Sequence, residues 1–205
     1  MPTLSPTGMS RRYALFRRVV LALGRFFLGF TVHGEEKVPP KGAVIIAANH
    51  HRLFDPVFVC MAVPRRVQWM AKKELFIPIL RKFINLIGAF PVDREGGGRS
   101  ALRAALGYLA EGWALGIFPE GTRQKNKDPG EPKSGAIMLA VRSNAPVLPV
   151  FIGRVPPPSA RLKGEKLHAY IGDPMTMDNA IRGGVEYRQS AERVLKDIYA
   201  LPEKR

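Results

Sequence analysis

The sequence contains a single cysteine, no long apolar run and no acidic residue among its first 32 positions. Because Cys60 stands alone in 205 residues, an intramolecular disulfide and a zinc cluster built from thiolates are both excluded. The longest uncharged stretch, residues 143–153, has 11 residues and contains two prolines. A membrane-spanning helix needs roughly 20 mostly apolar residues, so we expect the chain not to cross a membrane.

Several motifs of catalysis and cofactor binding are also absent. There is no GxSxG nucleophile turn, and Cys60 lies in the apolar run 57–62, where a buried and inert thiol is expected. The four histidines form no HExxH motif, and the chain has neither a P-loop nor a GxGxxG fingerprint. The sequence therefore predicts no metal site, no bound cofactor and no Ser or Cys nucleophile.

Basic residues, in contrast, are abundant. The chain has 32 Lys and Arg against 17 Asp and Glu, a net charge of +15. This excess indicates an anionic partner, which could be nucleic acid, an anionic membrane surface or a phosphorylated substrate. A hydrophobic content of 46% excludes a disordered chain, and the length suits one domain with a sizeable core. No recognition helix, RNP-like strand or zinc finger is visible, so we expect no nucleic-acid partner.

Residues 11–30 are predicted to form a basic amphipathic helix. Three of the five arginines among residues 1–32 recur every seven positions, and apolar residues alternate spacings of three and four on the far side. This apolar stripe consists of Tyr13, Phe16, Val20, Leu23 and Phe27. The pattern is typical of a helix at a membrane interface; packing of the stripe on the core is an alternative that is compatible with it. A secretory signal is not favoured, because arginines interrupt the apolar region and no small-residue cleavage site is evident.

Beyond residue 32, short apolar runs alternate with helical patterns. This alternation predicts an α/β fold with a mixed, largely parallel sheet flanked by helices. The expected strands are residues 43–48, 67–70, 89–92, 115–118, 147–152 and 167–171. The expected helices are residues 56–62, 78–87, 100–110, 134–143 and 186–199. In sheets of this kind, functional residues gather beyond the strand ends.

A histidine and an aspartate follow the first buried strand. His50 comes directly after residues 43–48, and Asp55 lies five positions further on, where a helix is predicted to begin. A strand-to-helix turn can bring the carboxylate to the imidazole. The carboxylate would then fix the tautomer, and the other ring nitrogen could take a proton from a substrate hydroxyl. Two alternatives remain at this point: Asp55 only caps the helix, or His51 is the base.

Two further strand ends predict an anion site. Arg94 offers a planar guanidinium that suits a phosphate. Glu120 and Gly121 form a tight turn that could expose main-chain N–H groups, with Thr122 adding a hydroxyl and Arg123 a positive charge. The structural alternatives are a surface ion pair for Arg94 and an ordinary strand-exit turn for the second segment.

Taken in order, these blocks resemble those of glycerolipid acyltransferases of the 1-acylglycerol-3-phosphate acyltransferase type. The matching segments are an NHxxxxD block at residues 49–55, residues 90–94, an FPEGTR block at residues 118–123, a proline-flanked block at residues 146–150, and AKKELF at residues 71–76. The resemblance covers roughly residues 32–152. It implies an acyltransferase domain over residues 33–205, preceded by a helical membrane anchor within residues 1–32.

The resemblance also implies roles for the matching residues. His50 would be the general base on the acceptor hydroxyl, and Asp55 would orient it. The glycerol phosphate would be bound by Arg94 and Lys73 together with the block from Glu120 to Arg123. One departure is Arg52, which occupies a position where many members carry serine.

The implied reaction is direct transfer of a fatty acyl chain from acyl-CoA or acyl-carrier protein to the sn-2 hydroxyl of 1-acyl-glycerol-3-phosphate (lysophosphatidic acid), which gives phosphatidic acid. Main-chain N–H groups near the motifs would stabilise the oxyanion. The enzyme would need no cofactor and would lie on an anionic phospholipid surface at the cytoplasmic face of the cell membrane. Acylation of another lysolipid, such as lyso-ornithine lipid, is the nearer alternative. A non-enzymatic basic membrane- or nucleic-acid-binding module is the more distant one.

Overall fold

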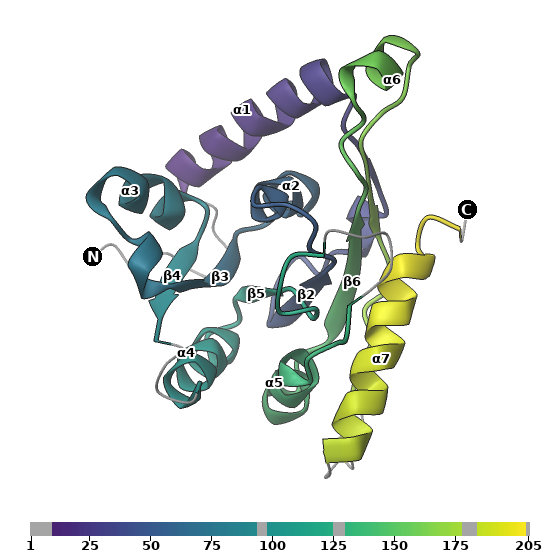
Figure 1. Cartoon of the computed structure of the whole chain (residues 1–205). Helices are drawn as coiled ribbons and strands as arrows, with labels where there is room; N and C mark the ends of the chain where they lie inside the picture. The colour runs from purple at the N-terminus through teal and green to yellow at the C-terminus, as the bar shows by residue number, and fades with distance from the viewer. Residues whose placement is uncertain (1–9, 94–97, 125–129, 178–183, 204–205) are drawn as a thin grey trace.

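A computed structural model describes residues 10–93, 98–124, 130–177 and 184–203 of the chain. Within these residues a seven-stranded sheet has the order β1-β7-β6-β2-β5-β3-β4 (Figure 1). The strands are β1 (Thr31–His33), β2 (Val44–Ala48), β3 (Val67–Lys72), β4 (Ala89–Val92), β5 (Ala114–Ile117), β6 (Val147–Ile152) and β7 (His168–Ile171). The five strands from β6 to β4 are parallel to one another, whereas β7 runs antiparallel to β6. The predicted mixed, largely parallel sheet is therefore confirmed.

Helices cover both faces of this sheet. The α-helices are α1 (Arg11–Leu28), α2 (Asp55–Ala62), α3 (Pro78–Leu86), α4 (Arg99–Ala110), α5 (Gly135–Ser143), α6 (Pro158–Leu162) and α7 (Gly184–Ala200). Two short 3-10 helices are η1 (Glu35–Lys37) and η2 (Lys73–Leu75). Helices α1, α2 and α3 pack on one face, and α4, α5 and α7 pack on the other (Figure 1). A parallel sheet that is covered on both faces needs strands that are apolar throughout.

The central strand β2 meets that requirement. All five of its residues are fully buried, which explains the continuous apolar run in the sequence. Val44, Ile46 and Ala48 face the α1–α3 side, whereas Ile45 and Ala47 face the α4–α7 side. Cys60 in α2 is buried as predicted, and burial raises the pKa of its thiol. The site is thus built at the end of a strand that is held from both faces.

Helix α1 is tied to the domain by Arg17. The guanidinium donates hydrogen bonds from Nε to the carbonyls of Cys60 (3.2 Å) and Val63 (3.1 Å), and from Nη2 to the carbonyl of Met61 (3.0 Å). It also forms a 2.8 Å ion pair with Glu35. The last carbonyls of a helix lack partners within the helix and carry partial negative charge. Arg17 therefore caps α2 and fixes α1 on the sheet at the same time.

The predicted apolar stripe of α1 is divided between two environments. Tyr13 is fully buried, and Phe16 and Val20 pack on the core, but Leu23 and Phe27 are about half exposed. Nearer the C-terminal end of α1, the side chains that pack on the core are instead Leu21 and Leu28. Leu23 and Phe27 belong to an exposed apolar set that consists of Leu15, Val19, Leu23, Phe26 and Phe27.

Candidate active site

The carboxyl ends of β2 and β6 are joined by a buried side chain. Asn49 follows β2 directly and is fully buried. Its Nδ2 donates to the carbonyl of Ile152 (3.0 Å), and the N–H of Ile152 donates to its Oδ1 (2.6 Å). The amide continues the hydrogen-bond ladder by one step beyond the strand. It thereby sets the point at which the chain leaves the sheet and His50 begins.

The chain then turns so that Asp55 meets His50. Asp55 is buried, and its Oδ2 lies 3.0 Å from Nδ1 of the His50 ring. The same oxygen accepts hydrogen bonds from the main-chain N–H groups of His51 and Arg52, both at 2.6 Å. Helix α2 has no side-chain hydrogen bond at its N-cap, Phe54. Asp55 thus points back toward the strand exit instead of capping α2, and its contact with the His50 ring is made through Nδ1 and not through Nε2.

Aromatic rings set the plane of the His50 imidazole. The ring of Phe118 stacks on it with centroids 4.0 Å apart and planes 15° apart. On its other face, Phe118 stacks on Trp69 at 5.0 Å and 18°. Gly116 in β5 lies against Trp69 with no space for a side chain, so only glycine permits this approach. An aromatic face favours a cation placed over it, which suits an imidazole that becomes charged when it accepts a proton.

The main chain of His50 is also held on both sides. Its N–H donates to Oε2 of Glu120 (3.1 Å), and its carbonyl accepts from the N–H of Gln124 (2.7 Å). Glu120 is only 2% exposed, and its Oε1 accepts a 2.7 Å hydrogen bond from the hydroxyl of Tyr199. Burial raises the pKa of Glu120, while the two hydrogen bonds act in the opposite direction. This carboxylate lies inside the protein, away from the surface where the expected phosphate would bind.

The last three residues of the FPEGTR block are at the surface. Gly121 has φ +71°, and its N–H donates to the carbonyl of Phe118 (2.9 Å), so this N–H is occupied by the turn itself. A Cβ at Gly121 would lie 3.1 Å from the side chain of Lys133. Thr122 and Arg123 are exposed. The hydroxyl and the positive charge that the sequence predicted for an anion site therefore face solvent here, with Lys133 close to the turn.

The other predicted anion-binding residues follow β3 and β4. Lys73 Nζ lies 2.8 Å from Oδ2 of Asp93, and both side chains are about half exposed. Arg94 lies outside the described residues, directly after Asp93 in the chain. The structure therefore places Lys73 next to the segment that leads to Arg94. The assignment of both residues to substrate binding stays a prediction.

Sequence reasoning missed Tyr199 and Trp69. Tyr199 lies in α7, 79 positions after Glu120, and it belongs to no recognisable pattern. Trp69 is 4% exposed, and nothing in the sequence showed that it would support the ring beneath His50. Among the described residues, no group of three or more His, Cys, Asp or Glu side chains could hold a metal ion.

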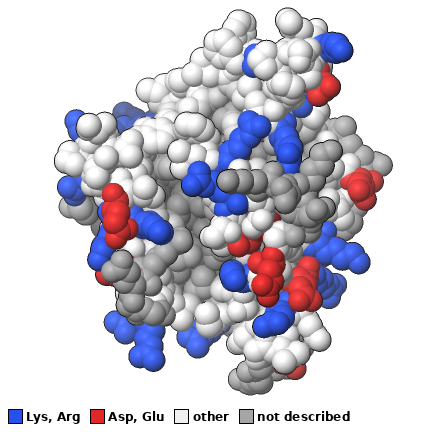
Figure 2. Space-filling model, in the orientation of Figure 1, with Lys and Arg blue, Asp and Glu red and all other residues white. Residues whose placement is uncertain are grey.

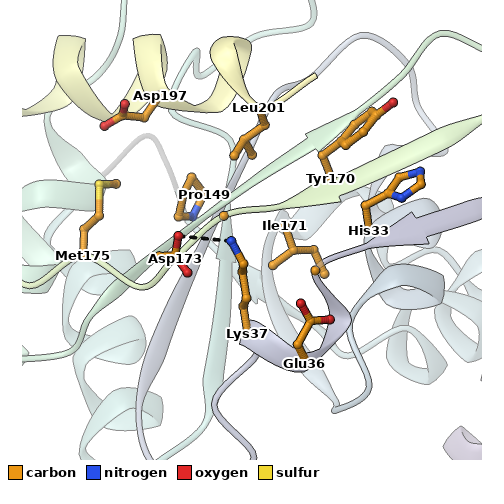
Figure 3. Close-up of a pocket in the computed structure, with 12 residues that line it drawn as sticks. His33, Glu36, Lys37, Pro149, Tyr170, Ile171, Asp173, Met175, Asp197 and Leu201 are labelled. Carbon is orange, nitrogen blue, oxygen red and sulfur yellow. Dashed lines mark hydrogen bonds and ion pairs between the residues drawn. The ribbon is translucent and has the colours of Figure 1, made fainter. Parts of the chain in front are cut away.

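A separate cavity is lined by residues of β1, β6, β7 and α7 (Figure 3). Its volume is about 400 Å³, and its wall includes His33, Lys37, Pro149 and Tyr170. Figure 3 shows the Lys37–Asp173 ion pair across it, at 3.1 Å. It contains none of the residues that surround His50.

The fold and the site define an α/β protein with a His–Asp pair at the carboxyl end of a parallel strand, an arrangement suited to removing a proton from a hydroxyl group. A family model described as Acyltransferase matches residues 29–153, and the chain belongs to this acyltransferase family.

Two curated relatives carry the same name, 1-acyl-sn-glycerol-3-phosphate acyltransferase. The protein from Bacillus subtilis is 34% identical over 149 residues, which is 72% of this chain and 74% of the relative. The protein from Streptococcus pneumoniae is 30% identical over 151 residues, 72% of this chain and 56% of the relative. The crystal structure of the 1-acyl-sn-glycerophosphate (LPA) acyltransferase PlsC from Thermotoga maritima superposes with a TM-score of 0.68 at 27% identity. That match covers 97% of this chain and 86% of PlsC.

Proposed function

We propose that the protein transfers a fatty acyl group from an acyl thioester to the sn-2 hydroxyl of 1-acyl-glycerol-3-phosphate, giving phosphatidic acid. The observation that carries this proposal is the 3.0 Å pair of His50 and buried Asp55 in a chain of the acyltransferase family. The names of the relatives support the choice of acceptor. The donor would be acyl-CoA or acyl-carrier protein.

The geometry supports a direct transfer in which His50 is the base. With Nδ1 paired to Asp55, Nε2 takes the proton from the acceptor hydroxyl. The oxygen attacks the thioester carbonyl and forms the new ester bond as the carbon–sulfur bond breaks. The departing thiolate receives the proton from the imidazolium, so no acyl-enzyme is required and His50 returns to its neutral state. Asp55 stabilises the charged ring between the two proton transfers.

The acceptor phosphate would be held by cations at the neighbouring strand ends. Arg94, Arg123 and Lys73 supply positive charge, and Thr122 supplies a hydroxyl donor. Glu120 and Gly121 serve this site through the turn that they build, because the carboxylate is buried and the Gly121 N–H is already engaged. Figure 2 shows Lys and Arg outnumbering Asp and Glu on the face that it presents. This excess suits an anionic acceptor and donor.

The test is a transfer assay with labelled acyl thioester and lysophosphatidic acid. His50→Ala removes the base, which is worth about 10²–10⁴-fold in rate. His51→Ala keeps the main-chain N–H that donates a hydrogen bond to Asp55. We expect a far larger loss for His50→Ala than for His51→Ala, and none for His168→Ala beside the remote cavity. Folded His50→Ala protein with wild-type activity would sink the mechanism. Product from lyso-ornithine lipid but not from lysophosphatidic acid would contradict the proposed identity of the acceptor.

We also propose that the protein binds peripherally to anionic lipid at the cytoplasmic face of the membrane. Among the described residues, no helix is both long and apolar enough to span a bilayer. The exposed apolar set of α1 lies beside exposed arginines, and α3 next to it exposes Ile79, Leu80 and Phe83. Neither α1 nor α3 contains an acidic residue. Apolar side chains flanked by cations are typical of an interfacial helix.

Vesicle binding tests this second proposal. Replacing Phe26 and Phe27 with Ser removes two exposed rings from α1, and we expect binding to phosphatidylglycerol-containing vesicles to weaken by at least about tenfold. Val185→Ser is the matched control, because Val185 is equally exposed apolar surface on α7. Binding that is the same to pure phosphatidylcholine, or unaffected by the double change, would contradict an anionic docking face on α1.

A further inference from the structure

The C-terminal helix reaches into the site through one hydroxyl group. Tyr199 in α7 donates a 2.7 Å hydrogen bond to Oε1 of Glu120, and the other oxygen of Glu120 accepts from the main-chain N–H of His50 at 3.1 Å. We infer that Tyr199 is a positioning residue for acyl transfer, because it holds Glu120 in the orientation that anchors the main chain of the base. This inference rests on the proposed function, since the positioned group is His50.

Tyr199 is well placed to act as a fixed support. Its ring packs edge-on against Phe151 at 5.6 Å and against His51 at 6.2 Å. The helix that carries it is anchored in the core by Ala191, Val194, Leu195 and Ile198, which are all buried. A hydroxyl on a rigid helix is located more accurately than one on a loop. The hydrogen bond from Tyr199 to Glu120 thus links the position of α7 to the residues that follow β2.

Glu120 depends on that hydroxyl. The carboxylate is 2% exposed, and Tyr199 and the His50 N–H are the hydrogen-bond donors found at its two oxygens among the described residues. A buried acceptor that loses its donor is destabilised by the full cost of its desolvation. Without the hydroxyl, Glu120 is expected to reorient or take up a proton, and its hold on His50 loosens. Small displacements of a base strongly reduce the rate of transfer.

The hydrogen bond between Tyr199 and Glu120 joins the part of the chain that matches the family model to a helix outside it. The family match ends at residue 153, whereas α7 spans Gly184–Ala200. Glu120 lies inside the matched region, but the group that completes its environment lies outside it. The inference therefore predicts that the catalytic site needs α7 for the placement of His50 as well as for the stability of the sheet.

The experiment compares Tyr199→Phe with Tyr187→Phe. The first change keeps the ring contacts and removes only the hydroxyl. The second removes a hydroxyl from the same helix, about 18 Å further along it, where Tyr187 packs on the core. For Tyr199→Phe we expect kcat to fall about five- to twentyfold, with KM for donor and acceptor within about twofold of wild type. Tyr187→Phe should match wild type in both constants.

A double-mutant cycle with Glu120→Gln separates positioning from a general loss of structure. If Tyr199 acts through Glu120, the Tyr199→Phe loss should shrink when Glu120 has already been replaced. Three results would each overturn the inference. These are an unchanged kcat in Tyr199→Phe, a rise in KM instead of a fall in kcat, and a double variant whose loss in kcat equals the product of the two single losses. The assay uses whichever acceptor the wild-type enzyme acylates. Failure of lysophosphatidic acid as acceptor therefore bears on the proposed function and leaves the result on Tyr199 intact.

Discussion

Two regions of the molecule bring histidine, aromatic and acidic side chains together, and they differ in what the histidine contacts. At the end of β2, His50 pairs with a carboxylate that is 4% exposed, and its ring stacks on Phe118. At the remote cavity, Nε2 of His33 lies 3.1 Å from Nδ1 of His168, and the His33 ring stacks on Tyr170 at 4.8 Å. Three acidic side chains, Glu36, Asp173 and Asp197, line this cavity, and Asp173 is largely exposed.

The surroundings of His50 give a physical reason for proposing it as the base. A buried carboxylate stabilises the imidazolium that forms when the ring accepts a proton. Asp55 is itself fixed by two main-chain N–H groups, so its charge is held in place before any substrate arrives. This preorganised charge beside His50 supports the proposal that acyl transfer occurs there.

The largest expected effect on activity comes from removing the charge of Asp55. In Asp55→Asn the side chain can still accept from the main chain, but its amide favours the wrong tautomer of His50 and no longer stabilises the imidazolium. We expect kcat to fall by about 10³–10⁴-fold, measured as initial rates of acyl transfer. Asp173→Asn at the remote cavity should leave kcat unchanged. Equal activity of the two variants would show that the buried carboxylate is not what distinguishes the regions.

A second prediction concerns the rings that stack on each imidazole. Phe118→Leu keeps an apolar side chain but removes the aromatic face beneath His50. A desolvated cation–π contact is worth about 1–2 kcal/mol, so we expect kcat to fall about five- to thirtyfold. Tyr170→Leu removes the corresponding ring from His33 and should not alter kcat. The melting temperature of both variants is the control, because a loss of activity that follows unfolding would not support a role for the ring.

The difference between the two regions also explains how far the sequence could predict the site. The His50–Asp55 contact depends on residues five positions apart and on a strand-to-helix turn, so local pattern was enough to propose it. The support of His50 from Glu120 spans 70 positions, and that from Tyr199 to Glu120 spans 79. Contacts of this range depend on the order of strands in the sheet, which hydrophobic periodicity does not encode.

The same reasoning applies to the fold. Every predicted strand is present within about two residues. The central strand β2 is a continuous apolar run buried on both faces, whereas β3, β4 and β7 each include positions that are exposed or half-buried. The three-residue strand β1 and the five-residue helix α6 were missed, since neither is long enough to show a period. Pro149 of the proline-flanked block lies in β6, which is an interior strand, and it lines the remote cavity.

The smallest expected effect comes from two exposed ion pairs, one near each region. Lys73 pairs with Asp93 at 2.8 Å beside the strand ends of the site, and Lys37 pairs with Asp173 at 3.1 Å at the cavity. Exposed ion pairs contribute little to stability, so neither Lys73→Ala nor Lys37→Ala should change the urea midpoint appreciably. The two variants should differ in KM for lysophosphatidic acid. Loss of a cation next to a bound phosphate weakens binding, which predicts that KM rises by about fivefold for Lys73→Ala alone.

Raising the ionic strength distinguishes a direct contact between Lys73 and the phosphate from long-range attraction between charges. A direct contact between Lys73 and the phosphate is screened less by salt than attraction between distant exposed charges. The fivefold difference between the variants should therefore persist as salt is raised, even if KM rises for all proteins. Equal KM values for Lys73→Ala and wild type would show that Lys73 forms a surface ion pair with Asp93 and does not bind the phosphate. An equal rise in both variants that disappears at high salt would attribute the effect to the net charge of the protein, because Lys37 lies at the remote cavity.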